Sequence, residues 1–298
     1  MRPGSPDSAP PTKPRRKQRL LRFLSFLTFL ALLAVAAYLA LPHLKFVLSD
    51  EEVIAIERAE RLAMATAGFP LPGAPDTTRL DARLTERGLK EGAPILIRIF
   101  KKEFELELWM KGDGVFQRFV TYPICRWSGM LGPKLREGDG QAPEGFYSVD
   151  AKALNPNSQY YRSFNVGYPN VFDAGLGRTG SLIMVHGACA SIGCFAMTDA
   201  QMGEIWRLVT AAFSGGQRRF QVQIYPFRLS GDALKTYETH PNHAFWSSLK
   251  AGNDLFEASA LPPRVTVCDR GYRFSPAGVY PNGDGGIENN CRQNSDKS

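Results

Sequence analysis

The sequence predicts a folded region built mainly of β-strands with a few helices. Apolar and polar residues alternate over 94–100 and again over 104–124, where Gly112-Asp113-Gly114 supplies a hairpin turn. A short apolar strand is expected over 181–185, and alternation returns at 218–229. Helical spacing is limited to a few stretches. The clearest begins at Thr198, where Gln201 three residues later matches a capping box, and ends at Gly215-Gly216.

The N-terminus carries an apolar segment behind a basic arm. Six basic residues lie between Lys13 and Arg22, and an almost uncharged run follows over residues 23–41. As a helix, this run is long enough to cross roughly 30 Å of hydrocarbon. Basic residues before such a run stay in the cytoplasm, so the rest of the chain is expected on the far side of the membrane. The length favours a retained single-pass membrane anchor, although the Ala-rich residues 34–40 leave a cleaved secretory signal open.

Composition shifts divide the chain into five predicted parts. A helical pattern follows the apolar run, and a spacer rich in Pro, Gly and charge leads into the strands. The expected parts are a cytoplasmic arm over 1–22, a membrane anchor over 23–41, a juxtamembrane helix and spacer over 42–93, the main domain over 94–229, and a C-terminal extension with one helix over 230–298.

The positive charge of the chain does not indicate a nucleic-acid partner. The 36 Lys and Arg against 29 Asp and Glu give a net charge of +7, but six of the basic residues belong to the N-terminal arm. Without them the folded region is nearly neutral. The sequence also lacks an aromatic stacking motif and zinc-finger spacing, so no nucleic-acid binding is expected.

The stretch MVHGACASIGCFAMTD, from Met184 to Asp199, contains the residues for nucleophilic chemistry. A strand that ends at His186 and a return to Cys194 before a helix can bring an imidazole beside a thiol. A neighbouring imidazolium and a helix N-terminus both favour the thiolate. The amides around Gly193 and Cys194 could donate to a developing oxyanion. This arrangement predicts acyl transfer through a thioester.

Two other fates of the loop cysteines remain open in the sequence. A disulfide between Cys189 and Cys194 is possible at this spacing and would make the loop a structural staple. A zinc site would need a fourth ligand that the loop does not provide, so neither a metal nor another cofactor is expected. Cys268 is expected to pair with Cys291, and Cys125 has no assigned partner.

The text VHG followed by SIGCFAMTD resembles the signature of the L,D-transpeptidase catalytic domain, the YkuD-like family. The preceding TYPICRWSGMLGPKLREGDGQAPEGFYSV is similar to the approach to the site in that family. The short spacing between His and Cys, together with GCFAMTD, resembles the YafK-like branch. The likeness covers residues 94–229, under half of the chain.

The resemblance implies a β-sandwich or barrel domain that acts on meso-diaminopimelate stem peptides of peptidoglycan. It makes Cys194 the nucleophile and His186 the general base, with the Gly187 carbonyl orienting the imidazole. Ser191 and Gly193 match the signature positions before the cysteine, and the Gly193 and Cys194 amides are the implied oxyanion donors. A hydrolase that detaches peptides or a wall-attached lipoprotein is an alternative. A second alternative is a non-catalytic peptidoglycan-binding module.

One position departs from the family pattern. Many members have Arg two places after the nucleophile, where this chain has Ala196. Arg178 and Ser191 are therefore the expected substrate contacts, because a guanidinium can hold a peptide carboxylate with two hydrogen bonds. An ordinary surface arginine is an equally good interpretation of Arg178.

Overall fold

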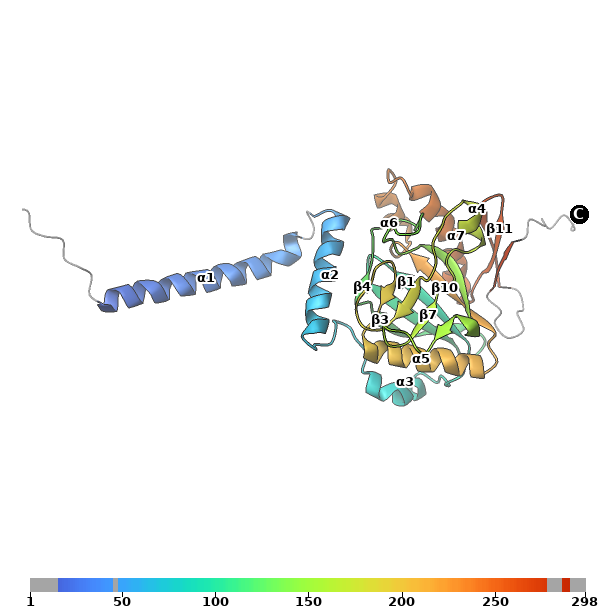
Figure 1. Cartoon of the computed structure of the whole chain (residues 1–298), viewed down its shortest axis with the longest axis horizontal. Helices are drawn as coiled ribbons and strands as arrows, with labels where there is room; N and C mark the ends of the chain where they lie inside the picture. Colours follow the sequence, from blue (N-terminus) through green and yellow to red (C-terminus); the bar gives the residue numbers. More distant parts are fainter. Residues whose placement is uncertain (1–15, 45–47, 278–285, 290–298) are drawn as a thin grey trace, which may run out of the picture. The chain divides into compact units, whose positions relative to one another are not determined.

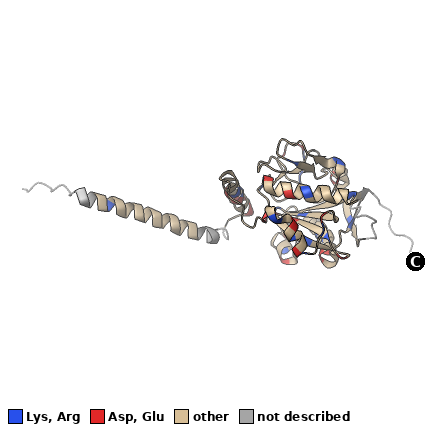
Figure 2. Ribbon diagram, turned by 90° about the horizontal axis from the view of Figure 1, so that it is seen from below, with Lys and Arg blue, Asp and Glu red and all other residues tan. Residues whose placement is uncertain are grey.

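The computed structural model describes residues 16–44, 48–277 and 286–289, and the chain divides into two compact units, residues 1–53 and 54–298. Within the first unit, helix α1 (Arg16–Leu44) contains the apolar stretch Leu20–Leu39. Figure 2 shows the coloured part of this helix almost entirely in tan, so hardly any charge lies between its grey ends. By length and composition it could cross a membrane, and a signal sequence has the same properties. The helix agrees with the predicted apolar segment.

Helix α2 (Asp50–Thr66) begins at a reciprocal cap. The Ser49 amide donates to the Glu52 carboxylate at 2.8 Å, and the Glu52 amide donates to the Ser49 hydroxyl at 3.4 Å. From Ile54, which is buried, the helix belongs to the second unit. The predicted juxtamembrane helix is thus present, and its later turns are part of the folded domain.

The second unit is organised around a five-stranded sheet in the order β3-β2-β1-β10-β5. Figure 1 labels three of its strands, β1, β3 and β10. Strands β1 and β10 are parallel, and the other neighbours are antiparallel. A second five-stranded sheet has the order β4-β9-β8-β7-β6, and a third has the order β12-β11-β13. The strands of the first sheet are β1 (Ile95–Phe100), β2 (Glu105–Lys111), β3 (Phe116–Pro123), β5 (Gly145–Asp150) and β10 (Arg219–Tyr225).

The strands of the other two sheets are shorter. Those of the second sheet are β4 (Arg126–Trp127), β6 (Leu154–Asn155), β7 (Ser163–Asn165), β8 (Met184–His186) and β9 (Phe195–Ala196). Those of the third sheet are β11 (Arg264–Cys268), β12 (Gly271–Ser275) and β13 (Ile287–Asn289).

Helices contribute more to the second unit than the sequence predicted, so the fold is mixed rather than mainly β. The two long ones are α5 and α7, of 16 and 17 residues. Several segments between the strands also contain short helices. After α2 the helices are η1 (Thr77–Arg79), α3 (Leu80–Glu86), η2 (Ala151–Ala153), α4 (Val171–Gly175), α5 (Asp199–Ser214), α6 (Gly231–Thr236) and α7 (His243–Ser259).

Helix α5 forms where the sequence predicted it. Thr198 accepts from the Gln201 amide, and the Gln201 side chain accepts from the Thr198 amide, so the capping box is complete. Its apolar face, which includes Met202, Ile205 and Val209, is buried in the main core. This helix starts four residues after the loop that carries Cys194 and therefore fixes the C-terminal end of that loop.

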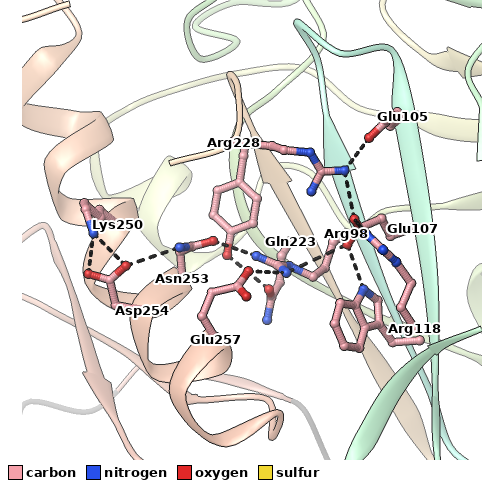
Figure 3. A network of polar contacts seen from close by, with 12 residues as sticks. Arg98, Glu105, Glu107, Arg118, Gln223, Arg228, Lys250, Asn253, Asp254 and Glu257 are labelled. Atoms are coloured by element: carbon pink, nitrogen blue, oxygen red, sulfur yellow. Dashed lines mark hydrogen bonds and ion pairs between the residues drawn. The ribbon is translucent and has the colours of Figure 1, made fainter. Parts of the chain in front are cut away.

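The C-terminal helix α7 is tied to the central sheet through buried charges (Figure 3). Arg98 on β1 donates to Glu257 at 2.7 Å and to Asn253 at 2.6 Å. Glu107 on β2 accepts from Arg118 and Arg228, each at 2.9 Å. Arg98 and Glu107 are both 1% exposed, so each depends on these partners for the polar interactions that burial removes. Residues beyond 230 therefore share a core with the strands.

Candidate active site

Two short parallel strands bring His186 and Cys194 to one cavity. Strand β8 ends at His186, which pairs with Ala196 of β9, and Cys194 directly precedes β9. The Met184 amide lies 3.4 Å from the Cys194 sulfur. The side chains of His186 and Cys194 both line a cavity of about 620 Å³. The two residues predicted to act together therefore face the same space.

The imidazole of His186 is oriented by the main chain. Its Nδ1 lies 2.6 Å from the Gly187 carbonyl oxygen. A carbonyl only accepts, so Nδ1 carries the proton and Nε2 has a free lone pair. The ring is buried and packs against Tyr160 at 5.0 Å between centroids. This tautomer can accept a proton at Nε2.

Burial keeps both reacting groups neutral at rest. It lowers the pKa of His186, and the hydrogen bond to Gly187 opposes this only in part. It also raises the pKa of the Cys194 thiol, against smaller opposite effects of the Met184 amide and the Lys134 charge. The sequence had suggested an imidazolium beside a thiolate. In the structure desolvation outweighs the favourable contacts, so the pair is an imidazole and a thiol.

Ser191 holds the backbone of Cys194. Its hydroxyl donates to the Cys194 carbonyl at 2.7 Å and accepts from the Cys194 amide at 3.0 Å. The Ser128 hydroxyl lies 3.0 Å from it and can donate to its remaining lone pair. The Ser191 hydroxyl is therefore engaged in this turn, while the residue also lines the cavity, so the predicted substrate contact stays a prediction.

The expected oxyanion donors differ in their availability. The Cys194 amide is occupied by Ser191 in this conformation. Within residues 48–277 and 286–289, the Gly193 amide has no hydrogen-bond partner in its own turn or elsewhere. Gly193 has φ +104°, a conformation that a side chain would strain, which accounts for glycine here. Gly193 is thus the more accessible of the two donors.

Arg178 is placed away from the cavity lining. Its guanidinium donates to Asp173 at 2.7 Å and stacks on the rings of Phe172 and Phe245. Asp173 is fully buried and also accepts from Tyr147 at 3.0 Å. This guanidinium pairs with a buried acid and does not line the cavity of His186 and Cys194, so the structure gives no support to the predicted contact of Arg178 with a substrate carboxylate.

A disulfide joins Cys125 to Cys189 and leaves Cys194 as a free thiol. The Cys125 amide donates to Ala196 and the Cys189 amide to Met197, at 2.9 and 3.2 Å. The bridge therefore fixes the loop after His186 to the start of β4. It excludes the predicted alternatives of a Cys189–Cys194 bridge and of a zinc site that uses both thiolates. The predicted partner of Cys268, Cys291, lies outside the described residues.

Arg126 and Glu144 were not predicted to have special roles. Arg126 on β4 lines the same cavity as Cys194. Glu144 is fully buried and accepts from Lys101 at 2.8 Å and from Trp246 at 2.7 Å. The sequence shows Arg126 only as a basic residue directly after Cys125. Its place in the cavity follows from the pairing of β4 with β9, which the sequence does not reveal.

Comparison with known sequences identifies the family. The model of the YkuD family, described as the L,D-transpeptidase catalytic domain, matches residues 94–224. YafK of Escherichia coli (strain K12), which carries an L,D-transpeptidase name, is 45% identical over 184 residues, covering 62% of this chain and 75% of the relative. YafK of Escherichia coli O157:H7 gives the same values.

Solved structures give more distant matches. The helical cell shape determining protein Pgp2 from Campylobacter jejuni has a TM-score of 0.38 at 20% identity, covering 60% of this chain and 67% of that one. Bd1075 of Bdellovibrio bacteriovorus has a TM-score of 0.34 at 19% identity, covering 56% and 62%. The assignment rests on the sequence relatives. With 45% identity over three quarters of YafK, the chain belongs to the L,D-transpeptidase family, whose members are enzymes that act on peptidoglycan peptides.

Proposed function

We propose that the protein is a peptidoglycan L,D-transpeptidase whose nucleophile is Cys194. The acyl donor is a stem peptide, and the attacked carbonyl belongs to the L-centre of meso-diaminopimelate. One observation carries the proposal. A free thiol and an imidazole with an unprotonated Nε2 line one cavity of about 620 Å³, large enough for a peptide segment.

Proton transfer accompanies attack because both groups start neutral. The Nε2 of His186 accepts the thiol proton as the sulfur of Cys194 bonds to the carbonyl carbon. The Gly193 amide donates a hydrogen bond to the resulting oxyanion. When the intermediate collapses, the C–N bond breaks and the imidazolium gives its proton to the departing amine. The product is a thioester on Cys194.

The acceptor decides the overall reaction. An amine from a neighbouring stem peptide gives a new cross-link, and water gives hydrolysis. Hydrolysis would release a peptide or a wall-attached lipoprotein. The alternative of a non-catalytic binding module with a stapled loop is less well supported, because the disulfide uses Cys189 and leaves the Cys194 thiol free.

The proposed site of action is the periplasmic face of the inner membrane. The apolar stretch Leu20–Leu39 would anchor the chain, with the basic arm in the cytoplasm. If that segment is cleaved, the same enzyme would be a soluble periplasmic protein.

The chemistry is tested with a purified tetrapeptide muropeptide. Incubation should add to the intact protein the mass of the donor minus that of the released terminal amino acid, and peptide mapping should place the adduct on Cys194. Cys194→Ala should give no adduct, and His186→Gln should slow acylation by about 100-fold or more. Both variants should melt as the parent does. An adduct on another residue, or binding without any adduct, would refute the proposal, and adding an amine acceptor separates cross-linking from hydrolysis.

A further inference from the structure

Arg126 occupies a place in the cavity that follows from strand pairing. Strand β4 pairs antiparallel with β9, and Arg126 is directly opposite Ala196. On the other side of β9, Ala196 pairs with His186. Residues paired in this way project from the same face of a sheet. Arg126, Ala196 and His186 therefore form a row across three strands.

Cys194 belongs to the same face. It precedes Ala196 by two residues, which is the repeat that returns a side chain to one side of a strand. Arg126, His186 and Cys194 all line the one cavity, so strand pairing and cavity geometry agree. Residue 196 itself is alanine and contributes no polar group to the row.

The guanidinium of Arg126 lacks the partners that a buried cation requires. Its Nε is buried without a hydrogen-bond acceptor. Over the described ranges, which omit 1–15, 45–47, 278–285 and 290–298, its side chain has no ion pair either. Arg83 and Arg178, two other largely buried arginines of this domain, each pair with a carboxylate. An unpaired guanidinium that faces a cavity has its hydrogen-bond donors available to a ligand.

A second cation lies near Arg126 and increases the local positive charge. The guanidinium of Arg58 stacks 4.5 Å above Trp127 and donates to the Gly129 carbonyl. Burial lowers the pKa of Arg58, and the charge of Arg126 lowers it further. Among the residues with assigned positions, neither cation faces a carboxylate of the protein. An anion bound at Arg126 would relieve this repulsion.

We propose that Arg126 binds a carboxylate of the acyl donor and thereby sets the position of the donor peptide relative to Cys194. The inference rests on the proposed function for the identity of the donor, a stem peptide rich in carboxylates. A planar guanidinium can bind such a group through two parallel hydrogen bonds. Arg126 on β4 supplies the positive charge next to Ala196 of β9, which has no polar side chain. This subsite takes the role that sequence analysis had given to Arg178.

The first test needs no peptidoglycan and uses the full chain in detergent. Cys194 is alkylated with N-iodoacetylglycine and with its neutral amide, N-iodoacetylglycinamide, and the two rates are compared. The carboxylate should give faster alkylation than the amide. Arg126→Gln should lower this ratio at least about threefold, as expected for loss of one nearby opposite charge. The ratio cancels any effect of the substitution on the reactivity of the thiol itself.

Controls separate anion binding from a structural effect. Arg126→Lys should keep much of the preference because it keeps the charge. Arg79→Gln should not change the ratio, because Arg79 is exposed and forms a surface pair with Glu86. In the unmodified chain, N-acetylglycine should protect Cys194 from the neutral reagent, whereas N-acetylglycinamide should not. An unchanged ratio in folded Arg126→Gln, or equal protection by both compounds, overturns the proposal.

The second test concerns the donor itself. Tetrapeptide donors with free and with amidated carboxyl groups are compared in the parent and in Arg126→Gln. In the parent, amidation of the carboxyl group that Arg126 binds should raise the KM of the donor. In Arg126→Gln, the free and the amidated donors should have the same KM. If the alkylation ratio changes but no donor acylates Cys194, the anion site stands and the proposed function fails. If acylation occurs with no dependence on Arg126, the anion site fails alone.

Discussion

His186 takes its direction from the Gly187 carbonyl and not from a carboxylate. The carbonyl oxygen accepts from Nδ1 at 2.6 Å, which sets the tautomer, but it bears only a partial negative charge. An imidazolium would therefore gain little from this contact, and burial disfavours it further. The base is thus suited to hold a proton only briefly, between the thiol and the leaving amine.

The pH dependence should reflect a neutral resting pair. Protonated His186 cannot accept the thiol proton, so kcat/KM should rise as pH increases through a pKa below 6.5. Alkylation by iodoacetamide requires the thiolate, so its rate should keep rising through a midpoint above pH 9.0. Both profiles can be measured on the same preparation. An alkylation rate that stays level down to pH 6 would instead indicate a thiolate–imidazolium pair.

Gly187 should not tolerate a side chain. A Cβ there would lie 2.5 Å from the Asp199 carboxylate and 2.9 Å from the Tyr161 Cβ. Gly187→Ala should therefore displace the carbonyl that orients His186, with a stability cost of about 1–3 kcal/mol and a larger loss of kcat. Urea unfolding and acylation rates measure the two effects. Gly231→Ala, where nothing lies within 4 Å, is the matched control and should change neither.

At the scale of elements, the disulfide restrains a strained loop. Ala188 and Cys189 have φ values of +65° and +52°, which are unfavourable for residues with side chains. The Asp199 carboxylate accepts from the Ala188 amide at 2.7 Å, and the bridge to Cys125 holds the next residue. Two independent ties therefore maintain the backbone directly after His186 and Gly187.

Removing the bridge should destabilise the domain and lower activity. The double variant Cys125→Ala/Cys189→Ala should lose about 2–5 kcal/mol of unfolding free energy, as is typical for a native disulfide. It should also acylate more slowly, because the loop can relax. Denaturant unfolding and intact-mass acylation are the measurements. A variant as stable and as active as the parent would show that the bridge does not restrain the loop.

Glu144 connects the loop before β5 with α7. It is fully buried and accepts from Lys101, from the Gly132 amide at 2.6 Å and from Trp246. Glu144→Gln leaves the Lys101 charge buried and uncompensated, so we expect a loss of about 3–5 kcal/mol in unfolding free energy. Lys101→Met/Glu144→Gln removes that charge and should recover part of the loss. A single variant as stable as the parent would contradict this account.

The elements that sequence predicted correctly have strong local signals. Helix α5 has a complete capping box and a continuous apolar face, and the β2–β3 hairpin has a glycine turn between alternating runs. Strands β4 and β9 have two residues each and no measurable periodicity, so the sequence could not predict them. Without their pairing, neither the partner of Cys125 nor the place of Arg126 in the cavity could be inferred.

Some features of individual side chains could be predicted from the local sequence, and others depend on the whole fold. The shared cavity of His186 and Cys194 could be anticipated because the motif keeps them close in sequence. The burial that makes the pair neutral depends on the whole fold, and it could not. The ion pair of Arg178 could not be anticipated, because its partner Asp173 lies in a short helix without a repeating pattern in the sequence.

At the scale of the whole molecule, the two units should be separable. The core of the second unit is built from Ile54 onward, and Ser49 supplies the cap of α2. A chain that begins at residue 48 should therefore be soluble, unfold cooperatively and keep its acylation rate. The full chain should remain with membranes after alkaline carbonate extraction if the apolar helix is retained. N-terminal mass analysis would detect cleavage, and an insoluble or unfolded truncated chain would contradict the separation.

Cys194, the proposed nucleophile, precedes a strand of only two residues, so its position depends on its neighbours. The Ser191 hydroxyl, the pairing of β9 with β4 and β8, and the start of α5 at Thr198 together determine where the sulfur lies. None of these ties contributes more than a small part of the total stability. Substitutions around the cavity can therefore abolish turnover in proteins that still purify, fold and melt normally. Screens that score only expression or thermal stability would miss such variants.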